Sequence, residues 1–334
     1  MPSSSGHEAP PDDANLVALG EVEEAEALLD QKPPKAEKAL GEGRSGGRGS
    51  GLGTAMLALP GFGWLGFYLL APLTLIVLVS FWTPAQNSYG FIKSWTLSNY
   101  TGLIHDSTYW NNMLSSFETA LIAVAACLVF GFPVAYFLAL KVEKLQNQIA
   151  LFIIALAPFW TSFLTRAIAR TFPLMGSQGA LNQFLTKIGV SSLDHPLINT
   201  DFSLLSVRLA MIQLYILFMV TPLFFTLAQV DRTALEAARD LGGNSFRTFK
   251  EVILPQTMPG IVIGSIFIFV LTMGEYGTVQ VVGGGNITSV GTIVNSKIGA
   301  IEYPQGAASA VILVLALTIG VFIITRFANL REEL

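Results

Sequence analysis

Charged residues are scarce in this 334-residue sequence. Only 13% of the residues are Asp, Glu, Lys or Arg, against roughly 25% in average soluble chains. Hydrophobic residues account for 52%, and the mean hydropathy is +0.57. These values exclude an ordinary soluble domain and predict a membrane protein. The net charge of -4 is small, so electrostatics give no reason to expect a nucleic acid partner.

Cysteine and nucleotide-binding motifs are also nearly absent. The single cysteine, Cys127, lies in an apolar run and cannot form a disulfide within the chain. The sequence contains no G-x4-G-K-[ST] phosphate-binding loop, so it cannot bind and hydrolyse ATP by that route. We therefore expect neither enzyme activity, nor a cofactor, nor a metal site in this chain. The energy for any transport must come from a partner or an ion gradient.

The first 53 residues differ in composition from the rest of the chain. They are rich in Gly, Ser, Pro, Ala and Glu and almost free of aromatic and β-branched residues. Such a segment buries too little apolar area to offset the entropy lost on ordering. We interpret residues 1–53 as a disordered cytoplasmic tail and residues 54–334 as a transmembrane domain.

Six segments are long and apolar enough to be membrane spans, which need about 20 mostly apolar residues each. Internal prolines such as Pro133, Pro158 and Pro222 indicate bent helices, which membranes tolerate when neighbours satisfy the freed backbone groups. We therefore predict an all-α integral membrane protein. The expected spans are residues 61–82, 118–140, 148–169, 204–228, 260–282 and 306–328.

The basic residues indicate the orientation of these spans, because cytoplasmic loops carry an excess of Lys and Arg. With the N-terminal tail inside the cell, ten basic residues near the membrane are cytoplasmic and six are external. This bias favours a cytoplasmic location for both termini. The cytoplasmic set is Arg44, Arg48, Lys141, Lys144, Arg232, Arg239, Arg247, Lys250, Arg326 and Arg331. The external set is Lys93, Arg166, Arg170, Lys187, Arg208 and Lys297.

A polar loop, residues 231–259, joins the fourth and fifth predicted spans. Thr233 and Glu236 have the spacing of a capping box, in which each side chain satisfies a backbone N–H of the helix start. We therefore expect a helix from about Ala234. Gly242 and Gly243 predict its end, because glycine adopts the left-handed conformation of a helix terminus without strain.

A second short helix is expected directly after these glycines. Asn244 or Ser245 is suited to cap its start. The helix is predicted to run to about Leu254, where Pro255 and Pro259 would end it before the next span. Two interpretations of the whole loop remain open: a docking surface for another protein, or an amphipathic hairpin in which Glu236 only caps a helix.

The loop resembles the EAA-x3-G-x9-I-x-L-P signature of membrane subunits of binding-protein-dependent ABC importers, with valine for isoleucine as the only departure. The matching residues are Glu236, Ala237, Ala238, Gly242, Val252, Leu254 and Pro255. The segments 126–139 and 157–166 are similar to spermidine/putrescine permease subunits of that superfamily. The resemblance covers most of residues 57–330 and leaves out the tail.

The resemblance implies a type I ABC importer permease fold in a bacterial inner membrane. It also implies three kinds of partner: a second, homologous permease, two ATPase subunits that hold the ATP and Mg, and a soluble substrate-binding protein. The loop would then be a coupling helix that inserts into the ATPase. Its coupling residues would be Glu236, Ala237, Ala238, Asp240, Leu241, Gly242, Leu254 and Pro255.

Intramembrane ionisable residues usually face a cavity or a partner, because they are costly in lipid. Glu275 follows the apolar run 261–271 and precedes Tyr276. A carboxylate beside an aromatic ring suits an organic cation through ion pairing and cation–π attraction. We therefore predict a substrate path that contains Glu275 and Tyr276, with Trp160 and Arg166 as further members.

Structural roles for the same residues remain open. Glu275 would alternatively pair with Arg166 or Arg170, or lie at the outer interface, and Trp160 would serve only packing. The leading function is the permease of an importer for polyamines or a related small cation. The alternatives are an importer for an anion, ferric ion or an opine, and an ion-driven secondary transporter.

Overall fold

The computed structural model describes residues 51–85, 90–175, 179–189, 202–240 and 242–332. Nearly all of the predicted disordered tail, and also Leu241, lie outside the described residues. The chain divides into two compact units, residues 1–69 and 70–334. The described residues of the first unit form the start of one helix, where the Trp64 and Tyr68 ring centroids lie 4.8 Å apart.

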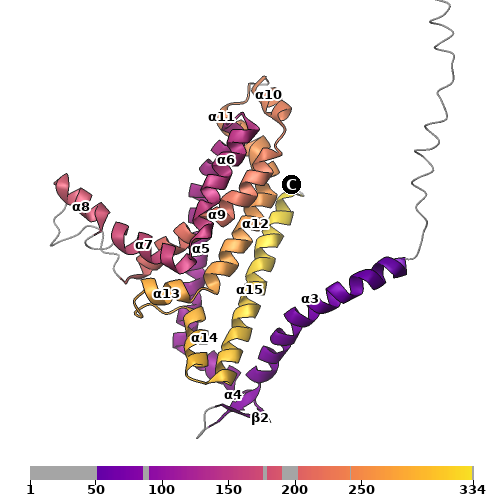
Figure 1. Cartoon of the computed structure of the whole chain (residues 1–334), viewed down its shortest axis with the longest axis vertical. Helices are drawn as coiled ribbons and strands as arrows, with labels where there is room; N and C mark the ends of the chain where they lie inside the picture. Colours follow the sequence, from indigo (N-terminus) through magenta and orange to yellow (C-terminus); the bar gives the residue numbers. More distant parts are fainter. Residues whose placement is uncertain (1–50, 86–89, 176–178, 190–201, 241, 333–334) are drawn as a thin grey trace, which may run out of the picture. The chain divides into compact units, whose positions relative to one another are not determined.

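The described part of the chain is helical apart from one short β-hairpin (Figure 1). In the hairpin, β1 and β2 are antiparallel and Thr83 is paired with Ile92. The elements are α3 (Gly51–Ser80), β1 (Trp82–Pro84), β2 (Phe91–Trp95), α4 (Ser98–His105), α5 (Ser107–Tyr136), the π-helix η2 (Phe137–Lys141), α6 (Leu145–Leu156), the 3-10 helix η3 (Ala157–Trp160), α7 (Phe163–Met175), α8 (Ala180–Lys187), α9 (Leu204–Ala228), α10 (Arg232–Asp240), α11 (Ser245–Thr248), the π-helix η4 (Phe249–Ile253), α12 (Leu254–Met273), α13 (Gly277–Val282), α14 (Val290–Gly299) and α15 (Tyr303–Glu332).

Five helical segments among the described residues are long and apolar enough to cross a membrane, and a sixth is a bent pair. The prediction of an all-α membrane protein is therefore confirmed, although several boundaries differ. The second span begins earlier, at Ser107, because Asp106 caps it through the N–H groups of Thr108 and Tyr109. The five segments are Gly63–Ser80, Ser107–Lys141, Leu204–Ala228, Ser245–Gly274 and Tyr303–Arg326.

The third predicted span, residues 148–169, is not one straight helix. Leu145–Trp160 and Phe163–Ala169 meet at an angle of 92°. Pro158 has no N–H to donate to a preceding turn, and the chain tightens into η3 before Thr161 becomes extended, with φ −96° and ψ 149°. The hydroxyl of Thr161 donates to the Pro158 carbonyl at 2.8 Å. The break leaves Trp160 at the corner.

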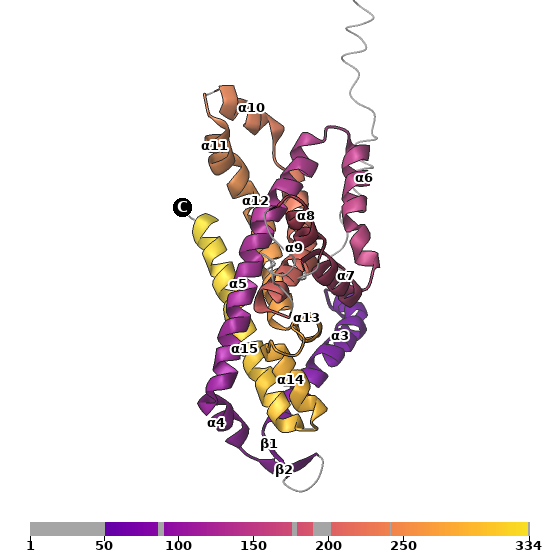
Figure 2. The same ribbon diagram turned by 90° about the vertical axis from the view of Figure 1, so that its left-hand side faces the viewer.

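The core of the second unit is formed by α5, α9 and α12, which run side by side in both views (Figures 1 and 2). Residues on α9 supply much of it: Tyr215, Met219 and Leu223 are each at most 1% exposed. At one end of this core lie α10, α11 and the end of α15, and at the other lie α4 and the hairpin (Figure 2).

Two glycines allow α12 to approach α9 closely. A Cβ atom at Gly260 would lie 2.8 Å from the Pro222 carbonyl oxygen and still closer to the Thr226 hydroxyl, and one at Gly264 would lie 3.1 Å from Met219 Cα. Glycines four residues apart commonly bring membrane helices together, because lipid tails supply no hydrophobic driving force for helix association. The pair therefore fixes the spacing of α9 and α12.

We predict that Gly260→Ala destabilises the purified chain by about 1–3 kcal/mol, the range for an overpacked core. The added methyl group collides with the Pro222 backbone, which cannot rotate away. Thermal unfolding in detergent measures the effect. Gly102→Ala in α4 is the matched control, since nothing lies within 4 Å of its added Cβ. Equal midpoints for the two variants would contradict the proposed close approach.

Candidate functional site

The first helix of the polar loop, α10, starts with a different cap from the one predicted. Asp231, not Thr233, is the capping residue: its Oδ1 accepts hydrogen bonds from the N–H and the hydroxyl of Thr233, both at 2.8 Å. The bonds from Thr233 lower the pKa of Asp231 below its usual value. The capping-box prediction was wrong because Asp231 supplies the acceptor two residues earlier. Glu236 is left exposed.

The turn after α10 agrees with its prediction. Gly242 has a φ of +78°, and the N–H of Gly243 donates to the Ala238 carbonyl at 3.0 Å, the six-residue closure of a Schellman motif. Asn244 then caps α11 by accepting the N–H of Arg247 at 2.8 Å. The two glycines therefore reverse the chain between α10 and α11.

The prediction that Pro255 and Pro259 end the second helix was wrong. The helical run continues from Ser245 to Gly274. Ahead of Pro255 the helix widens into the π-turn η4, in which the Leu254 N–H donates to the Phe249 carbonyl. In a π-turn each backbone N–H bonds to the carbonyl five residues earlier instead of four. This change of pattern accommodates Pro255, which has no N–H, at the start of α12.

The predicted coupling residues that the structure describes lie on α10, the turn after it and the start of α12. Glu236, Ala237 and Asp240 are exposed, as is Pro255, whereas Ala238 and Leu254 are half-buried. A groove of about 540 Å³ borders Glu236, Gly243 and Asn244, together with the end of the second span at Tyr136, Leu140 and Lys141. A second groove, of about 490 Å³, borders Ala237, Ala238, Arg247 and Val252.

One aromatic side chain packs this loop against the bundle, and another is exposed on its surface. The ring of Phe249 packs edge-on against Phe132 of α5, with centroids 5.3 Å apart, and Ile253 is 4% exposed. Phe246, one turn earlier, is 73% exposed. Arg247 and Glu251 form an ion pair at 3.0 Å on the outer surface of the same helical run. The loop is thus held to the bundle on one side and open on the other.

Glu275 lies at the break between α12 and α13, near the other end of the long helical run. Its Oε1 accepts the N–H of Thr278 at 2.8 Å, and its Oε2 accepts the hydroxyl of Tyr215 at 2.9 Å. Hydrogen bonds to charged groups contribute about 1.5–3 kcal/mol each. Tyr215 belongs to α9 and is 1% exposed, so a buried hydroxyl fixes a half-buried carboxylate.

The backbone around Glu275 is fixed as well. The hydroxyl of Ser289 donates to the Glu275 carbonyl at 2.9 Å. A Cβ at Gly291 would lie 2.9 Å from the same carbonyl oxygen, so α14 begins directly against this turn. The carboxylate therefore has a defined direction, while the neighbouring ring of Tyr276 is 50% exposed.

The other predicted path residues lie on the bent pair formed by Leu145–Trp160 and Phe163–Ala169. Arg166 is 8% exposed, and its guanidinium carbon lies 5.5 Å from the ring centroids of both Phe159 and Phe163. Trp160 is 81% exposed, so its ring is not packed among the described residues, and its place on the path stays a prediction. Phe163 also contacts the Tyr215 ring, with centroids 5.3 Å apart, which links α7 to the residues around Glu275.

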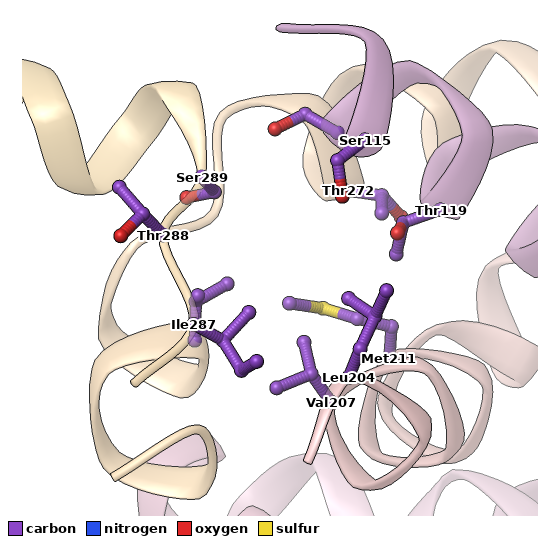
Figure 3. Close-up of a pocket in the computed structure, with 11 residues that line it drawn as sticks. Ser115, Thr119, Leu204, Val207, Met211, Thr272, Ile287, Thr288 and Ser289 are labelled. Carbon is purple, nitrogen blue, oxygen red and sulfur yellow. The ribbon is translucent and has the colours of Figure 1, made fainter. Parts of the chain in front are cut away.

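A small cavity, lined in part by Thr272 and Ser289, lies beside the Glu275 turn (Figure 3). Its volume of about 20 Å³ is enough for one water molecule. Figure 3 shows the hydroxyl-bearing side chains of Ser115, Thr119, Thr272, Thr288 and Ser289 around a floor of apolar groups. The Thr272 hydroxyl is buried and has no hydrogen-bond partner among the described residues.

Tyr215 is the site residue that the sequence analysis missed. The only signal was one tyrosine within the apolar run 209–220, and such a residue is more often packing than function. Its contact with Glu275 spans 60 positions. No periodic pattern or motif joins the two residues.

The fold matches solved ABC transporter structures. A bacterial ABC transporter that imports the acidic polysaccharide alginate matches with a TM-score of 0.54 and 16% identity, covering 83% of this chain and 95% of the matched chain. The same kind of transporter in complex with an alginate-bound periplasmic protein matches with a TM-score of 0.54 and 17% identity, covering 83% and 92%. The fold is therefore that of an ABC importer permease. No family model matches the sequence.

Relatives of known sequence define the family. The spermidine/putrescine transport system permease protein PotB of Escherichia coli is 34% identical over 273 residues, 81% of this chain and 96% of the relative. PotB of Haemophilus influenzae is 33% identical over 277 residues, 81% and 93%. The chain belongs to the PotB family of permease subunits. A putative 2-aminoethylphosphonate permease, PhnU of Salmonella choleraesuis, is 26% identical over 272 residues, 79% and 92%.

Proposed function

We propose that this chain is a permease subunit of an ATP-driven, binding-protein-dependent polyamine importer in a bacterial inner membrane. The single observation that carries the proposal is the 34% identity to PotB over 96% of its length. The Glu275 turn agrees with a cationic solute, because it presents a fixed carboxylate beside the half-exposed ring of Tyr276. The chain itself carries out no bond chemistry.

The partners in this proposal divide the work. Two ATPase subunits bind ATP and Mg, a soluble binding protein delivers the solute from outside, and a homologous permease completes the path. The coupling residues of the loop contact the ATPase: Glu236, Ala237, Ala238, Asp240, Leu241, Gly242, Leu254 and Pro255. Three features support this role: Glu236 and Ala237 are exposed, two grooves flank them, and Phe249 and Ile253 hold the loop to the bundle.

Solute specificity is the first test. We expect spermidine or putrescine to stimulate ATP hydrolysis and uptake by the complex reconstituted with its binding protein, because Glu275 offers a negative charge to an ammonium group. Sulfate, ferric citrate and 2-aminoethylphosphonate are tested in parallel. Stimulation by only one of these three would retain the importer and reject the polyamine assignment.

Charge reversal in the loop tests the coupling role. We expect Glu236→Lys to abolish solute-stimulated ATP hydrolysis in the assembled complex, because the exposed carboxylate lies on the face that meets the ATPase. Glu143→Lys is the matched control: it reverses an exposed carboxylate in the short segment before α6, outside the loop. Equal stimulation in both variants, with normal copurification of the ATPase, would disprove the coupling role.

Orientation is testable by cysteine labelling, because the only native cysteine, Cys127, is 0% exposed. Phe246 and Trp95 are 73% and 71% exposed and lie at opposite ends of the unit. With a membrane-impermeant maleimide and no ATPase subunits, we expect Trp95→Cys to react in intact spheroplasts. Phe246→Cys should react only after permeabilisation, and the unchanged chain in neither case. The reverse pattern would place the loop outside.

A further inference from the structure

Tyr215 is a buried polar residue for which the coupling mechanism has no use. It lies within α9 and is 1% exposed, and its hydroxyl donates to Glu275 Oε2 at 2.9 Å. The ring is packed against Phe163 at 5.3 Å and Phe218 at 6.2 Å between centroids. A buried hydroxyl is costly without a hydrogen-bond acceptor. The ring contacts and the acceptor together leave the hydroxyl little freedom to turn elsewhere.

The carboxylate of Glu275 has acceptor capacity left after these contacts. An ionised carboxylate offers about four lone-pair positions. Thr278 and Tyr215 each occupy one, and both of these donors are buried. Glu275 itself is only half-buried. The remaining lone pairs have no donor among the described residues, and the side of the carboxylate that carries them is called its open side.

We propose that Tyr215 is the positioning residue of the solute site: its hydroxyl holds the Glu275 carboxylate so that its open side receives an ammonium group of the polyamine. The inference rests on the proposed function and assigns the solute contact within it. A tyrosine suits this role because it fixes a carboxylate without adding charge. A lysine or arginine in its place would neutralise Glu275 and compete with the solute.

The test compares two buried tyrosines in the fully reconstituted importer. Tyr215→Phe removes the hydroxyl that donates to Glu275. Tyr109→Phe is the control, since Tyr109 is also 1% exposed and its hydroxyl donates to a backbone carbonyl, that of Ser309, at 3.2 Å. We expect Tyr215→Phe to lower kcat for spermidine uptake about tenfold, the scale of one lost hydrogen bond to a charged group. Tyr109→Phe should leave kcat unchanged.

Comparing KM with kcat separates a positioning role of Tyr215 from a general loss of folding or assembly. The KM for the solute-loaded binding protein should stay the same in Tyr215→Phe, because that protein docks at the outer surface and does not reach Glu275. A second comparison places Tyr215→Phe in a Glu275→Gln background. There it should cause no further loss, because the charge that it positions is already absent.

Glu275→Asp tests the same claim if Tyr215→Phe does not assemble. Aspartate keeps the charge but withdraws it by one methylene from the Tyr215 hydroxyl, so we expect a similar fall in kcat. Uptake at the full rate by Glu275→Asp, or equal uptake by Tyr215→Phe and Tyr109→Phe, would overturn the role of Tyr215. If the unchanged importer takes up no polyamine, the proposed function itself fails.

Discussion

The close contact between α9 and α12 is the constraint on which both functional regions depend. Within lipid there is no hydrophobic driving force for helix association, because lipid tails are as apolar as the side chains. Association therefore relies on close packing. Gly260 and Gly264 supply it by letting α12 meet the α9 backbone at Pro222 and Met219. The same two helices carry the polar loop at one end and the Tyr215–Glu275 bond nearer the other. Their spacing therefore sets the geometry of both regions together.

The helical run Ser245–Gly274 connects these regions directly. Its 30 residues correspond to about 45 Å of helix. The run begins at the Asn244 cap in the polar loop and ends immediately before Glu275. Because the π-turn η4 accommodates Pro255 without ending the helix, one continuous helical run joins the polar loop to the Glu275 turn. Tyr215 and Ser289 attach the Glu275 turn to α9 and to the start of α14.

Features that depend on the conformation or hydrophobicity of a single segment were predictable from the sequence. Features that depend on which of two neighbouring residues makes an interaction were not. The turn at Gly242 followed from the conformational demand of a helix end, and the long apolar runs predicted the membrane class. The cap prediction failed because Asp231 and Thr233 offered rival acceptors, and the helix end at Pro255 failed because a π-turn absorbed the proline. The 92° break after Pro158 was missed because it depends on a turn of the backbone. The length of an apolar segment does not reveal such a turn. Tyr215 was missed because its partner is distant in sequence.

The electrostatics of the proposed path depend on which charges are accessible. Arg166 carries a positive charge that would repel a polyamine, but it is 8% exposed and its guanidinium carbon lies 5.5 Å from the ring centroids of both Phe159 and Phe163. Those rings present their negative faces to the guanidinium and hold it within the protein. Glu275 is more accessible, and its two protein donors carry no formal charge. Of the two side chains Arg166 and Glu275, the carboxylate of Glu275 is therefore less shielded by the described residues.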